Sequence, residues 1–66
     1  MRITLNGEAR EFDAACDMNE LLAQLDVEAN AVAIERNLEI VPKSAYADTT
    51  LQDGDTIEIV EFIGGG

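Results

Sequence analysis

The chain ends in Ile63-Gly64-Gly65-Gly66, and the reactive group of this segment is the α-carboxylate of Gly66. Glycine has no Cβ, so a glycine tail is the thinnest and most adaptable rod that a polypeptide can form. Such a rod suits chemistry in which a partner enzyme takes the carboxylate into a narrow channel. The plain alternative is a frayed terminus, because the ends of domains are where disorder concentrates.

The position of the tail favours the chemical interpretation, because it leaves directly from a predicted strand over residues 56–63 without a linker. Ile57 and Ile59 are expected to face the core, and strict alternation then turns the apolar residues that follow toward the outer side. Either the strand bulges near residue 60 or its end leaves the core, and we favour the second. An apolar cluster beside a free tail would form a docking surface. The predicted partner-docking residues are Val60, Phe62 and Ile63.

Length and charge limit what this chain can be. Its 66 residues allow one domain, predicted over residues 1–63, followed by a flexible tail over residues 64–66. The formal net charge is −10, with 14 acidic against 4 basic residues, which disfavours nucleic acid and anionic membranes as partners. A protein with a basic docking face is favoured instead.

The cysteine and histidine content narrows the chemistry further. One cysteine cannot form an internal disulfide, and the sequence contains no histidine, which excludes His-based catalytic triads and zinc sites. The N-terminus becomes polar too early for a signal peptide, and no apolar run approaches membrane-spanning length. We therefore expect a cytoplasmic protein that binds no metal.

The first half of the chain predicts a hairpin and a helix. Met1, Ile3 and Leu5 alternate with polar residues, and Asn6-Gly7 is a strong signal for a type I′ turn. Residues 8–13 would form the return strand, with Phe12 as its best core candidate. The helix is predicted over residues 18–28, where Asp17 and Glu20 have the spacing of a capping box. Its apolar stripe is formed by Met18, Leu21, Leu22, Leu25 and Ala29.

The second half predicts shorter elements. Strands are expected over residues 31–36 and 38–41, joined by a turn at Asn37-Leu38, and the second strand stops at Pro42. Residues 43–50 show no clean period, which indicates an irregular segment or a single helical turn with Tyr46 packed inward. Together these elements predict an α+β fold, with one main helix packed on a mixed sheet of four or five strands. The first and last strands could pair in parallel at its centre.

Cys16 is an alternative candidate for sulfur chemistry. No cationic group lies near it in the sequence, whereas Asp13 and Asp17 would raise its pKa and keep the thiol unreactive. We therefore interpret Cys16 as a small packing residue before the helix.

Three other polar features are weaker candidates. Asp53 and Asp55 could bind a cation, but two carboxylates without a full ligand set favour a solvated turn. Glu58 and Glu61 are three residues apart on a strand, so they point to opposite faces and cannot act as an acid/base pair. Lys43 could be a conjugation site, although an exposed lysine is usually just solvated.

Three stretches carry a resemblance to a known family. They are Asn37-Leu38-Glu39-Ile40-Val41-Pro42-Lys43, then Leu51-Gln52-Asp53-Gly54-Asp55-Thr56-Ile57-Glu58-Ile59, and finally Ile63-Gly64-Gly65-Gly66. In this order they resemble the β-grasp, ubiquitin-like proteins, and within them the ThiS family, the sulfur carriers of thiazole formation in thiamine biosynthesis. The family pattern often has glycine at position 38 and threonine where the helix begins.

The resemblance implies a carrier that performs no catalysis itself and binds no cofactor. An activating, E1-like enzyme using ATP-Mg would adenylate the Gly66 carboxylate. A persulfide loaded by a cysteine desulfurase would then convert it to a thiocarboxylate, which thiazole synthase would receive. Carriers for molybdopterin synthase, tRNA thiolation or cysteine synthesis share this fold and tail. A β-grasp interaction or tagging module without sulfur chemistry is the other alternative.

Overall fold

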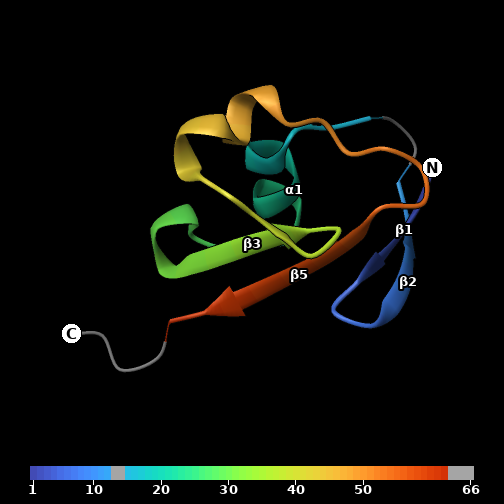
Figure 1. Cartoon of the computed structure of the whole chain (residues 1–66), viewed down its shortest axis with the longest axis horizontal. Coiled ribbons are helices and arrows are strands. Elements are labelled where there is room, and N and C mark those ends of the chain that lie inside the picture. Colours follow the sequence, from blue (N-terminus) through green and yellow to red (C-terminus); the bar gives the residue numbers. More distant parts are fainter. Residues whose placement is uncertain (13–14, 63–66) are drawn as a thin grey trace.

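A computed structural model describes residues 1–12 and 15–62 of the chain (Figure 1). Its elements, in chain order, are β1 (Arg2–Leu5), β2 (Glu8–Glu11), α1 (Met18–Gln24), the 3-10 helix η1 (Ala29–Ala31), β3 (Val32–Arg36), β4 (Glu39–Val41), the 3-10 helix η2 (Lys43–Asp48) and β5 (Thr56–Glu61).

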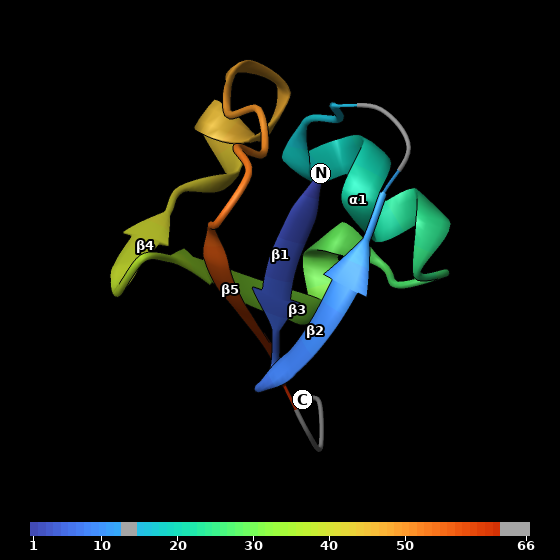
Figure 2. The same ribbon diagram turned by 90° about the vertical axis from the view of Figure 1, so that its right-hand side faces the viewer.

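The strands form one mixed sheet in the order β2-β1-β5-β3-β4 (Figure 2). β1 and β5 pair in parallel at its centre, as the sequence predicts, and the other neighbours are antiparallel. The first and last strands of the chain therefore share the middle of the sheet. This arrangement makes the strand that leads into the tail a central strand rather than an edge strand.

Local sequence signals explain how the first elements form. Asn6 and Gly7 have φ angles of 48° and 83°, as a type I′ turn requires. The capping box at the start of α1 is complete, because the Glu20 N–H donates to Asp17 Oδ1 at 2.8 Å and the Asp17 N–H donates to Glu20 Oε1 at 2.9 Å. The return strand β2 is exposed throughout and ends at Glu11, before the half-buried Phe12.

The predicted end of the helix at residue 28 is wrong, because α1 ends at Gln24. Asp26 adopts a left-handed conformation with φ of 57°. Its N–H donates to the Ala23 carbonyl, and the Val27 N–H donates to the Leu22 carbonyl. These two bonds form a Schellman motif, which normally carries glycine at the left-handed position. Aspartate occupies that position here, so no glycine marks the helix end in the sequence.

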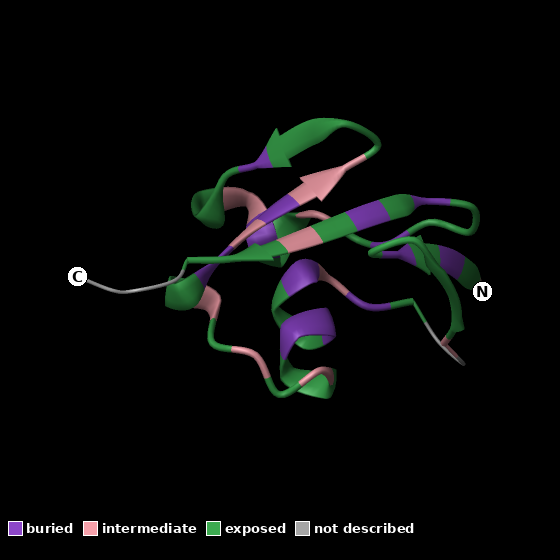
Figure 3. Cartoon of the chain, turned by 90° about the horizontal axis from the view of Figure 1, so that it is seen from below, coloured by how far each residue is buried: buried purple, intermediate pink, exposed green. Residues whose placement is uncertain are grey.

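A single core lies between α1, η2 and one face of the sheet (Figure 3). The helix contributes three residues of its predicted stripe as fully buried side chains, and Tyr46 of η2 is buried as expected. Along β5 the buried Ile57 and the half-buried Ile59 alternate with exposed residues. The buried residues of the core are Ile3, Leu5, Cys16, Met18, Leu21, Leu22, Val32, Ile34, Val41, Tyr46, Leu51 and Ile57.

The start of β5 is fixed by the carboxylate of Asp55, which is buried with 5% exposure. Asp55 accepts hydrogen bonds from the Gln52 N–H at 2.8 Å, Arg36 Nε at 2.9 Å and Asn37 Nδ2 at 3.0 Å. Asn37 Oδ1 in turn accepts from the Thr56 N–H at 2.9 Å. The prediction that Asp55 belongs to a solvated turn is therefore wrong: its carboxylate ties the β3–β4 turn to β5.

The same carboxylate supports an unfavourable backbone conformation. Asn37 and Leu38 have φ angles of 51° and 72°, so the β3–β4 turn has positive φ at both central residues. Leucine rarely adopts this conformation, which costs on the order of 1 kcal/mol. Asn37 is held by bonds to both Asp55 and Thr56, and these contacts offset the strain at Leu38.

We expect Asp55→Asn to lower the free energy of unfolding at neutral pH by about 2 kcal/mol, because a charge-assisted network loses its anion. Burial alone would raise the pKa of Asp55, but the bonds from Gln52, Asn37 and Arg36 outweigh it and lower the pKa below 3.8. The stabilisation is therefore complete above the unfolded-state pKa and is lost as the pH falls through the lower folded-state pKa.

Denaturant unfolding of the two proteins between about pH 2.5 and pH 7 measures this difference, which should shrink below about pH 4. Asp53→Asn is the matched control, since Asp53 is exposed in the same loop and asparagine keeps an oxygen that can accept from the Arg2 N–H, so its effect should stay within about 0.5 kcal/mol. A stability difference between wild type and Asp55→Asn that is independent of pH would contradict the assignment.

Candidate functional site

The end of β5 exposes two apolar side chains, as the sequence predicts. Val60 is 52% exposed and Phe62 is 60% exposed. The register between β3 and β5 runs without interruption from Arg36↔Ile57 to Val32↔Glu61, which excludes a bulge near residue 60. The strand therefore leaves the core at its end. We call Val60 and Phe62 the apolar root.

The apolar root is held firmly on one side. The Phe62 N–H donates to the Ala31 carbonyl at 2.8 Å, which extends the contact with the β3 segment to the residue before Ile63. Ala33 lies opposite Val60 in the register. The expected docking residue Ile63 and the tail residues Gly64, Gly65 and Gly66 lie outside the described part of the chain, so their roles stay predictions.

Acidic side chains surround the apolar root. Glu58 shares the outer face of the sheet with Val60 and lies opposite Glu35 on β3. Glu61 is exposed beside the root on the other face, which confirms that Glu58 and Glu61 cannot form an acid/base pair. Ile40 on β4 is 64% exposed and lies opposite Glu35, and sequence reasoning assigned it no role. Such a face complements a partner with an apolar centre and a basic rim.

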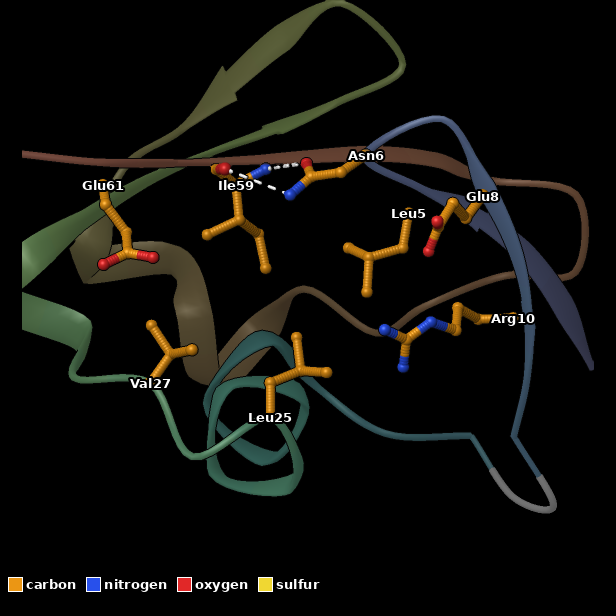
Figure 4. A pocket seen from close by; sticks show the side chains of 8 residues that line it. All are labelled: Leu5, Asn6, Glu8, Arg10, Leu25, Val27, Ile59 and Glu61. Atoms are coloured by element: carbon orange, nitrogen blue, oxygen red, sulfur yellow. Dashed lines mark hydrogen bonds between the residues drawn. The ribbon is translucent and has the colours of Figure 1, made fainter.

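A groove that sequence reasoning missed opens on the helix side of β5 (Figure 4). It has a volume of about 280 Å³ and lies between β5, the β1–β2 hairpin and the segment after α1. No local sequence pattern indicates this groove, because its lining residues come from three separate parts of the chain. The groove is lined by Leu5, Asn6, Glu8, Arg10, Leu25, Val27, Ile59 and Glu61.

The remaining candidates show no arrangement suited to chemistry. Lys43 is exposed at the start of η2. Asp53 accepts a hydrogen bond from the Arg2 N–H at 2.7 Å and so caps a backbone group. Within residues 1–12 and 15–62, no group of three or more Cys, Asp or Glu side chains could hold a metal ion. Over the same residues no helix has the length and apolar character needed to span a membrane.

Cys16 is a packing residue with 5% exposure. Burial raises the pKa of its thiol, and the nearby carboxylates of Glu20 and Asp17 raise it further. The contribution of Asp17 agrees with the prediction, whereas Asp13 lies outside the described residues. A buried thiol with a raised pKa is a poor nucleophile at neutral pH.

The sheet order, with its central parallel pair and one helix packed on one face, defines a β-grasp, ubiquitin-like protein, and this confirms the predicted fold. The exposed apolar root lies at the end of its central strand, β5. The chain belongs to the ThiS family, whose model matches residues 3–66.

Individual relatives agree with this assignment. The chain is 38% identical over 66 residues to the sulfur carrier protein ThiS of Escherichia coli K12, and the match covers all of both chains. The crystal structure of a thiamine biosynthesis protein (ThiS) from Geobacter metallireducens superimposes with a TM-score of 0.87 at 38% identity, again over all of both chains. A thiazole synthase of Paramagnetospirillum magneticum is 54% identical over 66 residues, and the chain spans 20% of its length.

We expect Cys16 to react slowly with an aromatic disulfide reagent at neutral pH, at least about 100-fold more slowly than in denaturant, because its thiol is buried and protonated. Absorbance of the released thiolate measures both rates. Cys16→Ala should load sulfur as well as wild type does. A fast native reaction, or a variant that cannot load sulfur, would give Cys16 a chemical role.

Proposed function

We propose that this protein is a sulfur carrier in thiamine biosynthesis, with the Gly66 carboxylate as its carrying group. The observation that supports the proposal most is the family match, which runs through residue 66 and so includes the terminal glycines. The geometry at residue 62 is compatible with this function, because the last strand is anchored in the sheet up to the root of the tail.

The proposed chemistry starts from a poor electrophile. A carboxylate repels nucleophiles, so an E1-like activating enzyme first directs it onto the α-phosphorus of ATP-Mg, and pyrophosphate leaves. A persulfide from a cysteine desulfurase then attacks the acyl carbon, a C–S bond forms and AMP leaves. A thiol reduces the resulting acyl disulfide and releases the thiocarboxylate. Thiazole synthase then receives the sulfur as the acyl C–S bond breaks, and an oxygen atom from the sulfur acceptor or from water takes its place on the acyl carbon and restores the carboxylate of the carrier.

In these reaction steps the carrier itself contributes recognition by its partners and access to its terminal carboxylate. A Cβ at Gly65 or Gly66 would widen the tail and crowd the attacked carbonyl, which is why glycine suits both positions. Ordering the tail in a channel costs about 1–2 kcal/mol per residue, so contacts elsewhere must supply the binding energy. The apolar root is exposed where such contacts are needed.

The proposed partners are an activating enzyme, a persulfide donor and thiazole synthase. The thiazole synthase of Paramagnetospirillum magneticum supports the last assignment, since this chain matches a fifth of that longer protein. A net charge of −10 favours partners with basic docking faces and disfavours nucleic acid. The cytoplasm is the proposed location, because a thiol-dependent reaction that uses ATP requires a reducing compartment.

Incubation with an activating enzyme, a cysteine desulfurase, cysteine and ATP-Mg should convert the terminus to a thiocarboxylate. Intact mass spectrometry should then show an increase equal to one sulfur minus one oxygen atom, with the change confined to the C-terminal peptide. A variant with one alanine added after Gly66 is the control and should gain no sulfur. An unchanged wild-type mass, or a functional extended variant, would contradict the carrier function.

Val60→Asp and Phe62→Asp should each weaken binding to the activating enzyme by about tenfold or more, because a charge replaces an apolar contact. Both proteins should keep their native circular dichroism, since both side chains are more than half exposed. Isothermal titration calorimetry measures the affinity. Leu38→Asp is the matched control, because Leu38 is 88% exposed at the opposite end of the sheet and its loss should change little. Unfolding of the Val60 and Phe62 variants would show instead that these residues are core.

A further inference from the structure

The C-terminal half of β5 has a backbone neighbour on one side only. β3 pairs with it as far as Glu61. β1 pairs with it only at Thr56 and Ile57, because the chain turns away at Asn6 directly after Leu5. Beyond Ile57, the β1 side of this central strand therefore has no paired strand in the described structure.

The side chain of Asn6 occupies the next pairing position. The Ile59 N–H donates to Asn6 Oδ1 at 2.8 Å, and Asn6 Nδ2 donates to the Ile59 carbonyl at 3.4 Å (Figure 4). The primary amide thus replaces a peptide group of a neighbouring strand. The Asn6 side chain therefore satisfies the backbone N–H and C=O of Ile59. It pairs with no residue beyond Ile59, because one side chain is too short to reach the next one.

Glu61 is the next residue whose backbone groups point to the open side. Phe62 donates to Ala31 on the β3 side, and Ile59 bonds to Asn6 on the β1 side. Backbone groups alternate along a strand, so the N–H and C=O of Glu61 face away from β3. No residue among 1–12 and 15–62 bonds to either group. The N–H and C=O of Glu61 form an open edge directly beside the apolar root.

The groove lies directly below this edge. Ile59 and Glu61 belong to its lining, together with Leu25 and Val27, which follow the end of α1 at Gln24 (Figure 4). A strand added beside Glu61 would alternate its side chains. One set would enter the groove, and the other would lie on the outer face beside the apolar root.

We infer that thiazole synthase docks here by β-strand addition, with an extended segment of the synthase paired to the backbone of Glu61. The segment carries an apolar side chain that fills the groove and a basic residue that meets the Glu61 carboxylate, as the net charge of −10 favours. The identity of the partner rests on the proposed function, whereas the open edge and the groove rest on the structure alone.

Glu61→Pro tests the backbone bond. Proline lacks an N–H and is tolerated where that N–H faces away from the ladder, so pairing with β3 is kept. Glu61→Ala is the matched control, because it removes the same carboxylate and keeps the N–H. In calorimetric titration with thiazole synthase, Glu61→Pro should bind about fivefold or more weakly than Glu61→Ala. Equal affinities, or a difference seen only with the activating enzyme, would overturn the inference.

Amide exchange of the wild-type protein gives a second readout that does not depend on a variant folding. In nitrogen-15 spectra of the complex with unlabelled thiazole synthase, exchange of the Glu61 amide should slow by about tenfold or more. The Ala9 amide is the internal control, because the register of β2 with β1 turns it to the outer edge of β2, where β2 separates it from β1 and β5. An unprotected Glu61 amide in the saturated complex would overturn the inference.

These binding experiments use the carrier with an unmodified carboxylate, so they are independent of sulfur loading. If the mass test fails and Glu61 is still protected, the sulfur chemistry is wrong and strand addition stands. If sulfur is loaded and transferred while Glu61 stays unprotected, the carrier function stands and strand addition is wrong.

Discussion

The backbone ladder of β5 is the constraint on which the rest of this protein depends. The strand lies between β1 and β3 and carries Ile57 into the core, while its far end holds Val60 and Phe62 in the open. A terminal peptide would lose its orientation if it left from a loop. Here the ladder reaches Phe62, so sheet hydrogen bonds hold the backbone up to the last described residue.

The ends of this ladder are held by polar side chains rather than by more apolar packing. Asp55 and Asn37 fix the start of β5 against the β3–β4 turn, and Asn6 extends the pairing of β1 by one residue. A 66-residue domain buries only about 60% of the surface of its unfolded chain, so its core alone gives marginal stability. Buried hydrogen bonds to a charged group add stability at the point where the sheet would otherwise loosen.

In the proposed function, the surface charge and the apolar root would act together in recognition. An acidic protein is attracted by basic faces, but salt at physiological concentration screens this attraction beyond about 8 Å. The final contact therefore depends on short-range burial, which the exposed residues near the tail can provide. This division of roles suits a carrier that must visit several partners in turn, because strong steering and modest contact area allow fast binding and fast release.

The sequence by itself determined the hairpin and the capped helix start, and it favoured the exposure of Val60 and Phe62, because each depends on turn chemistry or on strand alternation. It also determined the family, through three stretches spread along the chain. The roles of Ile63 and of Gly64, Gly65 and Gly66 remain predictions, since they depend on partners rather than on the fold.

Only the tertiary structure decided the role of Asp55, the early end of α1 and the groove. In the sequence Asp55 resembles an ordinary turn residue. Its structural role depends on hydrogen bonds from Arg36 and Asn37, which are distant in sequence and adjacent in space. Asp26 ends the helix in a conformation that local propensity assigns to glycine. The open edge at Glu61 depends on the register of β5 with β3 and on the residue at which β1 turns away from β5. The sequence does not show this edge, because neither segment alone encodes its pairing with a distant segment.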